Sequence, residues 1–330
     1  MTRFKLSAPY ADTTELPDPS LDVAVIVPVY KGEVFIDRLV SRLEDTLARI
    51  SENYQIILVD DRFPDSSWEL IQAHSKRDQR VVGIKLSRNF GQHSAISAGI
   101  ASADAAWYVV MDCDLQDPPE AILTLYEAAV ARNSDVVLAE RTTSGPSAGR
   151  NIGSALFNSV LSWSSGLKLS SKYGNFRIFS NKVAAAYRHY PERLRLFPAI
   201  LSQVGFSSTS VSITRDQRPE GGSSYNFLKL AKLSLETIIA YSERPLWVTA
   251  FVGSIVCGIS FLYGLWVFLS ALIFGSQVPG FTTLAILILF FGGLQVFLTS
   301  LVGLYVGRNL DEAKSRPIYI IEATTKRDLD

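Results

Sequence analysis

Cysteine is nearly absent from this chain of 330 residues, where Cys113 lies in an acidic segment and Cys257 in a long apolar run. We expect Cys113 to lie in an aqueous domain and Cys257 in an apolar, membrane-like environment, so the two cannot form a disulfide. This excludes a disulfide-stabilised scaffold and fits a reducing compartment. Histidine is also scarce, and the 3 histidines are scattered without the spacing of a metal site. The formal net charge of +0 gives no support for nucleic-acid binding.

Charged residues are missing altogether between Leu246 and Gly307. Two apolar runs, 246–274 and 281–307, each exceed the roughly 20 residues that cross about 30 Å of hydrocarbon. Residues 275–280 read as a turn between them. We therefore predict a hairpin of two transmembrane helices. Two buried core helices of a soluble domain are the alternative, but such helices seldom lack every ionisable residue over this length.

Basic residues flank this hairpin on both sides. They are Lys229, Lys232 and Arg244 before it and Arg308, Lys314 and Arg316 after it. The positive-inside rule then places the catalytic domain and both termini on the cytoplasmic side of the inner (plasma) membrane. The first 20 residues are polar and lack an apolar core. We therefore predict a flexible N-terminus without a signal peptide.

Short β-branched runs alternate with helical patterns in the first half of the chain. Strands are expected at 21–30, 55–59, 81–86, 107–111 and 135–139, with helices beginning near 34, 66, 93 and 118. This alternation predicts an α/β fold, with a mostly parallel sheet covered by helices on both faces. Ligands of such sheets bind at the carboxyl ends of the strands. The polar residues at those ends are Tyr30, Asp60, Asp61, Arg88, Asn89, Asp112, Asp114, Glu140 and Arg141.

Asp112 and Asp114 flank Cys113 at the end of the fourth expected strand. Paired carboxylates at this position suit a Mg²⁺ or Mn²⁺ ion that also bridges phosphate oxygens. A solvated acidic turn is the alternative. Asp60 and Asp61 could accept hydrogen bonds from a ribose or a base, whereas helix capping is an equal alternative for Asp65.

The remaining segments complete the expected organisation. Residues 21–225 form the catalytic domain, and 226–243 form an amphipathic helix that lies on the membrane surface or packs as an ordinary helix. The cytoplasmic tail, 308–330, holds a strand-like run at 318–321.

Several motifs together carry a family resemblance. They are Val27-Pro28-Val29-Tyr30, Leu58-Val59-Asp60-Asp61 with Asp65, Leu86 to Gln92, Met111 to Pro119, Gly174 to Arg177, and Arg218 to Tyr225. From about Asp22 to Leu310 the chain resembles the membrane-anchored polyisoprenyl-phosphate glycosyltransferases of the GT-A, family 2 type. Bactoprenol glucosyltransferases and dolichyl-phosphate mannose synthases belong to this group. The resemblance implies a Rossmann-like GT-A catalytic domain.

The resemblance also implies roles for individual residues. The nucleotide pocket would be lined by Pro28, Tyr30, Glu33, Asp60 and Asp61, with Asp112 near the ribose or sugar. Asp114 and Gln116 would carry the metal. The lipid phosphate would be gripped by Arg141, Arg150 and Ser154, with added charge from Arg218.

The chain departs from the family pattern at three places. Arg62-Phe63-Pro64 follows Asp61 where Gly-Ser is usual, Lys31 replaces an asparagine, and Ser223-Ser224-Tyr225 replaces Ser-Lys-Tyr. These departures affect the nucleotide contacts and one cationic phosphate contact rather than the reaction class.

The expected reaction is inverting transfer of a sugar from a nucleotide-sugar to undecaprenyl phosphate. UDP-glucose is the first choice of donor, followed by donors of 4-amino-arabinose-type sugars and GDP-mannose. A processive polysaccharide synthase is a rival, but two spans are too few for a channel and no Gln-x-x-Arg-Trp motif occurs. A non-catalytic membrane scaffold that retains a nucleotide-binding domain is the other rival.

We also expect a homo-oligomer, a tetramer by resemblance. Small residues in the second span permit close helix approach, and residues 318–321 could pair with a neighbouring chain. These small residues are Gly292, Gly293, Ser300, Gly303 and Gly307.

Overall fold

A computed structural model describes residues 18–142, 173–190, 195–214, 280–314 and 316–326, with isolated positions between 251 and 273. The chain divides into two compact units, one of residues 1–150, 168–223 and 317–330 and the other of residues 151–167 and 224–316. The helix expected at 226–243 lies outside the described residues, as does most of the expected span 246–274.

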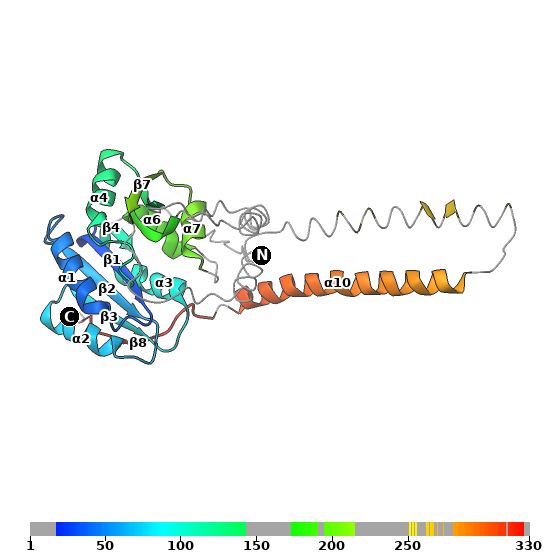
Figure 1. The fold of residues 1–330 in the computed structure, drawn as a ribbon, viewed down its shortest axis with the longest axis horizontal. Helices are drawn as coiled ribbons and strands as arrows, with labels where there is room; N and C mark the ends of the chain where they lie inside the picture. The colour runs from blue at the N-terminus through cyan, green and yellow to red at the C-terminus, as the bar shows by residue number, and fades with distance from the viewer. Residues whose placement is uncertain are drawn as a thin grey trace, which may run out of the picture. The chain divides into compact units, whose positions relative to one another are not determined.

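The first unit is built on a sheet whose early strands alternate with helices along the chain (Figure 1). Its strands are β1 (Leu21–Val29), β2 (Tyr54–Asp60), β3 (Val81–Leu86), β4 (Ala105–Val110), β5 (Val136–Thr142), β6 (Tyr173–Ser180), β7 (Ser208–Thr214) and β8 (Ile321–Thr324). Their order across the sheet is β7-β5-β6-β4-β1-β2-β3-β8. β1 pairs in parallel with β2 and β4, and β3 pairs in parallel with β2. The prediction of a mostly parallel α/β sheet is confirmed.

Two strands run against the others. β6 is antiparallel to both β4 and β5, so β5 and its parallel partner β7 run in the same direction as the central strands. β8 is antiparallel to β3 at the edge of the sheet.

Helices cover both faces of the sheet and create two hydrophobic cores. α1 (Ile36–Leu47), α2 (Ser67–Arg77) and α4 (Ala121–Ala131) pack into one core, and α3 (Gln92–Ser102), α6 (Asn181–His189) and α7 (Phe197–Gln203) pack into the other. Side chains of β1 alternate between the two: Val25 joins the first core and Ile26 the second. Because both faces are buried, the strand reads as a continuous apolar run in the sequence.

Gly99 allows α3 to approach β1 closely. A Cβ atom at this position would lie 2.4 Å from Cγ2 of Ile26. The close approach brings the first turn of α3 to the carboxyl end of the central strands.

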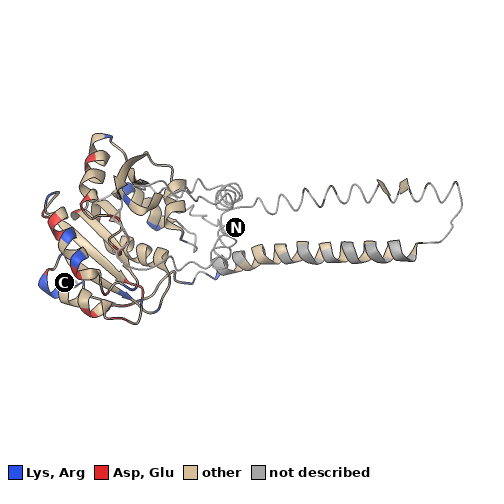
Figure 2. Ribbon diagram, viewed as in Figure 1, with Lys and Arg blue, Asp and Glu red and all other residues tan. Residues whose placement is uncertain are grey.

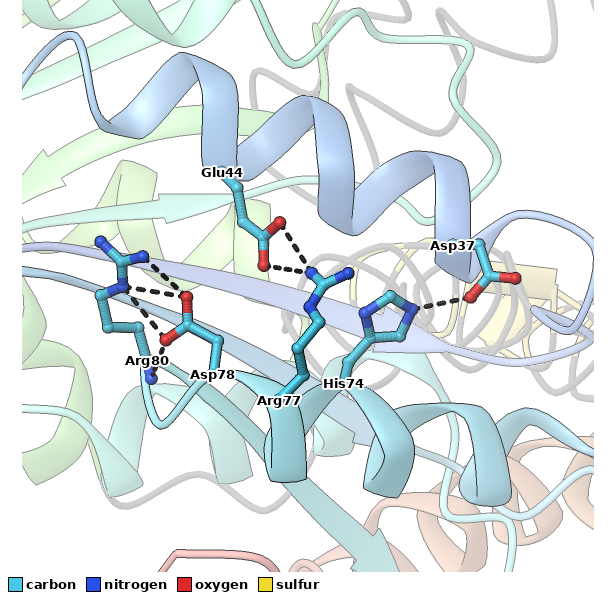
Figure 3. A network of polar contacts seen from close by, with 6 residues as sticks. All are labelled: Asp37, Glu44, His74, Arg77, Asp78 and Arg80. Atoms are coloured by element: carbon cyan, nitrogen blue, oxygen red, sulfur yellow. Dashed lines mark hydrogen bonds and ion pairs between the residues drawn. The ribbon is translucent and has the colours of Figure 1, made fainter.

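A polar network joins the outer surfaces of α1 and α2 (Figure 3). Nη2 of Arg77 donates to Oε1 and Oε2 of Glu44 at 2.6 and 2.7 Å, and Nε2 of His74 lies 2.7 Å from Oδ1 of Asp37. Acidic and basic residues lie close together on these helices (Figure 2). The pair of Arg77 and Glu44 is partly exposed and contributes at most about 1 kcal/mol, whereas His74 is buried at 9% exposure and only its partner Asp37 is exposed. We assign the network to stability.

The C-terminal tail returns to the first unit. β8 begins at Ile321, the last residue of the expected strand at 318–321, and it pairs with β3 of the same chain. Ile321 thus pairs within its own chain, because the edge of β3 offers backbone groups to a further strand. Pairing of residues 318–321 with a neighbouring chain stays a prediction.

The second unit contains α10 (Phe281–Ala313), which includes the whole of the expected second span. Several of its apolar side chains are exposed, including Leu284, Ile288 and Val306. No helix among the residues that the structure describes meets the length and apolarity needed to cross a membrane. The transmembrane hairpin therefore stays a prediction. The homo-oligomer also stays a prediction, because the structure contains a single chain.

Candidate active site

The predicted site residues gather where the parallel strands end. Asp60 is the last residue of β2, in register with Val29 of β1 and Lys85 of β3. Met111 follows β4, and its backbone N–H donates to the carbonyl of Ile26 in β1 at 3.2 Å. The loops after β1, β2, β3 and β4 thus lie along one edge, as the alternation predicts.

A residue with positive φ follows each of these four strands. They are Lys31 at 59°, Arg62 at 54°, Gly91 at 92° and Leu115 at 57°. Only glycine adopts this conformation without cost, so the other three each carry about 1 kcal/mol or more of backbone strain. Such strain persists where neighbouring contacts hold the chain, and it is concentrated at functional sites.

Asp112 is held by two side-chain amides. Oδ1 of Asp112 accepts a hydrogen bond from Nε2 of Gln92 at 2.6 Å and another from Nδ2 of Asn175 at 3.3 Å. Gln92 begins α3, and Asn175 lies in β6 beside β4. Two donors on one oxygen fix the orientation of the carboxylate at the strand end.

Asp114 organises the turn that follows. Its Oδ1 accepts a hydrogen bond from the backbone N–H of Gln116 at 3.2 Å, across Leu115. The Asp114 side chain is half-buried and that of Gln116 is buried. The carboxylate therefore lies in a shaped turn rather than in a freely solvated one.

These residues suit a cation that takes most of its ligands from phosphate and water. The described residues contain no group of three or more His, Cys, Asp or Glu side chains placed to hold a metal ion. Mg²⁺ needs fewer, because it commonly uses one or two carboxylates together with substrate phosphates. The Asp114 carboxylate is compatible with that requirement, and the metal roles of Asp114 and Gln116 stay predictions.

Cys113, between the two carboxylates, is chemically quiet. Burial raises the pKa of its thiol to about 12, against a smaller opposing hydrogen bond from the backbone of Tyr30. It is a free, buried cysteine that packs in the core below the site.

Asp60 and Asp61 are buried and serve the loops around them. Oδ1 of Asp60 accepts from the backbone N–H of Arg62 at 3.0 Å. The two carboxylate oxygens of Asp61 accept from the backbone N–H groups of Phe90 at 2.7 Å and Gly91 at 2.9 Å. Burial raises the pKa of both carboxyl groups, and these hydrogen bonds oppose the rise. Asp61 thereby fixes the loop after β3, and its predicted nucleotide contact remains untested.

Tyr30 lies exposed at the end of β1 and forms an aromatic pair. Its ring is 4.9 Å from that of Phe63 in an edge-to-face arrangement, and Nζ of Lys31 lies 5.0 Å from the centre of the Phe63 ring. Glu33 accepts from the backbone N–H of Ser66 at 3.4 Å. Pro28 is buried within β1, where it supports the edge.

The predicted acceptor residues are described only in part. Arg141 belongs to β5, in register with Ile213 of β7. Arg150, Ser154 and Arg218 lie outside the described residues.

The sequence interpretation missed two residues that donate hydrogen bonds to Asp112. Gln92 and Asn175 were assigned no role, although both fall inside motifs that carry the family resemblance. His93, next to Gln92, has a buried Nδ1 atom without a hydrogen-bond partner. Burial, and then the charge of Arg177, lower the pKa of His93 to about 4. The sequence did offer one signal for Gln92, which is a polar residue without an assigned role at the start of an otherwise apolar helix.

A mostly parallel sheet with an Asp-x-Asp turn at the carboxyl edge of β4 is the architecture of a GT-A-like glycosyltransferase. The chain belongs to glycosyltransferase family 2, whose model matches residues 24–188. It is therefore an enzyme that transfers a sugar.

Curated relatives extend the likeness over nearly the whole chain. An uncharacterized glycosyltransferase, YkcC of Bacillus subtilis (strain 168), is 35% identical and covers 92% of this chain and 94% of its own length. The prophage bactoprenol glucosyl transferase homolog of Escherichia coli (strain K12) is 33% identical, with 93% and 100% covered. The undecaprenyl-phosphate 4-deoxy-4-formamido-L-arabinose transferase of Aeromonas hydrophila is 32% identical, with 91% and 92% covered.

Likeness to solved structures is weaker. The glucosyl-3-phosphoglycerate synthase of Mycobacterium tuberculosis, in complex with Mn²⁺, uridine diphosphate and phosphoglyceric acid, has a TM-score of 0.46 at 13% identity. It covers 67% of this chain and 77% of its own. This likeness is too low to support a functional conclusion.

Proposed function

We propose that this enzyme transfers a hexose from a nucleotide-sugar, UDP-glucose as first choice, to undecaprenyl phosphate with inversion at the anomeric carbon. The observation that carries the proposal is the Asp112 carboxylate, held by Gln92 and Asn175 one residue from the Asp114 turn. The names of the Escherichia coli and Aeromonas hydrophila relatives, which contain bactoprenol and undecaprenyl phosphate, support this class of acceptor.

In the proposed reaction, an acceptor phosphate oxygen bonds to the anomeric carbon of the sugar. The bond between that carbon and the donor diphosphate breaks, and its electron pair leaves with the diphosphate. A phosphate monoester has a second pKa of about 6, so near pH 7 the acceptor is mostly a dianion and needs no strong base. Catalysis then depends on positioning and on charge stabilisation.

The protein groups divide this work between donor and acceptor. Asp112 accepts a hydrogen bond from a ribose or sugar hydroxyl, and the Tyr30 and Phe63 rings flank the nucleotide. A divalent ion, when bound, supplies positive charge to the leaving diphosphate, with Asp114 and Gln116 as its protein ligands. Arg141, Arg150 and Arg218 grip the acceptor phosphate, because guanidinium groups bind phosphate oxygens in pairs. Ser154 assists them as a hydroxyl donor.

We place the reaction at the cytoplasmic face of the membrane. Drawing the polyprenyl chain into water costs about 0.8 kcal/mol for each CH₂ group, so the acceptor phosphate stays near the headgroups. The uncharged runs 246–274 and 281–307 and the amphipathic segment 226–243 support this location.

The test is incubation of the purified full-length protein with undecaprenyl phosphate, Mg²⁺ or Mn²⁺ and a panel of labelled nucleotide-sugars. Transfer of label to the lipid from one donor is expected, with UDP-glucose as the leading candidate. Label that enters only a long polysaccharide, or donor that is neither bound nor consumed, contradicts the proposal.

A further inference from the structure

The C-terminal tail meets the donor edge of the sheet through one acidic residue. Glu322, in β8, forms an ion pair with Arg62, the residue that follows Asp60 and Asp61. Its other carboxylate oxygen lies 4.0 Å from Nζ of Lys85 in β3. We propose that Glu322 is a positioning residue for the donor-site loop, acting through Arg62. This inference rests on the proposed function insofar as that loop binds the nucleotide.

The tail is firmly placed on the sheet. The backbone N–H of Ser87 donates to the carbonyl of Ile320 at 2.9 Å, and that of Thr325 donates to the carbonyl of Gly83 at 2.9 Å. The backbone N–H of Gly83 in turn donates to Oγ1 of Thr325 at 2.7 Å. Glu322 therefore extends from a strand whose backbone is hydrogen-bonded to β3 and the residue after it, both before and after Glu322 along the chain.

Arg62 is held at both its backbone and its side chain. Its backbone N–H donates to Oδ1 of Asp60 at 3.0 Å, and its guanidinium pairs with Glu322. Its φ of 54° is a conformation that a side chain disfavours. Contacts on both sides explain why this strained backbone persists. Among the residues that the structure describes, the hydrogen bond to Asp60 is the polar contact that Arg62 keeps when Glu322 is removed, so the loop gains freedom to relax.

A change in the Arg62 backbone is passed to the aromatic pair of Tyr30 and Phe63, because Phe63 follows Arg62 directly in the chain. The Phe63 ring contacts the Tyr30 ring, and Nζ of Lys31 lies 5.0 Å from the centre of the same Phe63 ring. A shift of the Arg62 backbone therefore moves one wall of the site that we assign to the nucleotide. β8, which carries Glu322, follows α10 in the chain.

The ion pair itself is modest in energy. Both side chains are more than two-fifths exposed, at 44% and 41%. Pairs of this kind contribute about 0.2–1 kcal/mol, which corresponds to a change of up to about fivefold. The ion pair matters because it restrains the backbone of Arg62, whose φ is positive.

The test compares Glu322→Gln, Arg62→Gln and the double variant in the full-length protein. The first readout is hydrogen exchange at the backbone amides of residues 62 and 63, measured without substrate. The second is calorimetric affinity for uridine diphosphate with Mg²⁺, together with KM and kcat for the donor. Glu52→Gln removes the same charge from an exposed residue before β2, and Lys326→Ala removes a tail contact with the carbonyl of Ser102.

We expect Glu322→Gln to speed exchange at both amides and to raise donor KM by about threefold to fivefold, with kcat unchanged. The double variant should be no worse than Arg62→Gln alone. In about 1 M salt the difference from wild type should disappear, because the Debye length falls to about 3 Å. Both control variants should match wild type.

Unchanged exchange in Glu322→Gln, or additive effects in the double variant, overturns the inference. Faster exchange in a protein that binds no uridine diphosphate would instead contradict the proposed donor site, while the contact between tail and loop would stand.

Discussion

Nε2 of Gln92 donates a 2.6 Å hydrogen bond to Oδ1 of Asp112, and so the first residue of α3 orients the first carboxylate of the Asp-x-Asp turn. Asn175 contributes a longer bond to the same oxygen. Hydrogen bonds to charged groups are worth about 1.5–3 kcal/mol, so this amide matters more to the site than its place on an exposed helix turn indicates.

Replacing Gln92 by Met keeps the length of the side chain and removes its donor. We expect transfer to fall about tenfold to a hundredfold, because Asp112 loses its fixed orientation, with little change in melting temperature. Steady-state transfer and thermal unfolding measure the two effects. Gln79→Met, at an exposed turn, is the matched control. Normal transfer in Gln92→Met would show that Asn175 alone suffices.

Removing the Asp114 carboxylate tests the metal role. We expect Asp114→Ala to abolish nearly all transfer while the fold is retained, because a substrate-bound cation loses its protein anchor. Asp114→Asn, which keeps the shape and an acceptor oxygen for the Gln116 N–H, separates charge from turn geometry. Circular dichroism checks the fold. Full turnover of the wild-type enzyme in excess chelator would refute the metal requirement.

Arg150 should act on the acceptor rather than on the donor. We expect Arg150→Ala to raise the apparent KM for prenyl phosphate, or to lower kcat, by about tenfold, since a lost arginine–phosphate contact is worth roughly 1.4 kcal/mol. Acceptor kinetics alongside calorimetric titration of the nucleotide-sugar distinguish the substrates. Loss of donor affinity with normal acceptor dependence would assign Arg150 to the other substrate.

His93 should make the stability of the first unit depend on pH. Burial and the charge of Arg177 lower its pKa from 6.5 to about 4, so the folded state favours the neutral ring. Below pH 6.5 the unfolded chain binds a proton that the folded chain does not, and stability falls until the pH reaches about 4. At higher pH this contribution is constant.

The comparison of wild type with His93→Gln separates the contribution of His93 to the pH dependence of stability from the contributions of other titrating groups, including Asp60 and Asp61. Between pH 6.5 and 4 we expect the wild type to lose about 3 kcal/mol more unfolding free energy than the variant. Chemical denaturation across this range provides the measurement. Parallel pH profiles would mean that His93 is solvated enough to titrate normally.

Much of the catalytic unit could be read from local patterns. The five expected strands all occur, because β-branched runs buried on both faces leave a continuous apolar signal. Asp60 and Asp112 were placed at strand ends for the same reason. No strand was expected at β6, Tyr173–Ser180, and its antiparallel direction depends on its neighbours β4 and β5 rather than on its own residues.

Contacts between distant residues were beyond the sequence. Asn175 meets Asp112 only because β6 runs beside β4, and Glu322 meets Arg62 only because β8 returns to the edge of β3. The segment at 318–321 carried a strand signal, but an edge strand can pair with any open edge, in its own chain or in another.

The amino-acid sequence by itself determined the class of fold, the edge of the sheet where polar residues gather and the uncharged runs near the C-terminus, because each follows from the periodicity or composition of neighbouring residues. The tertiary structure decided which amides orient Asp112, which loops Asp60 and Asp61 hold, and which strand receives the tail. Those outcomes depend on strand order and register, which bring together groups that no local pattern connects.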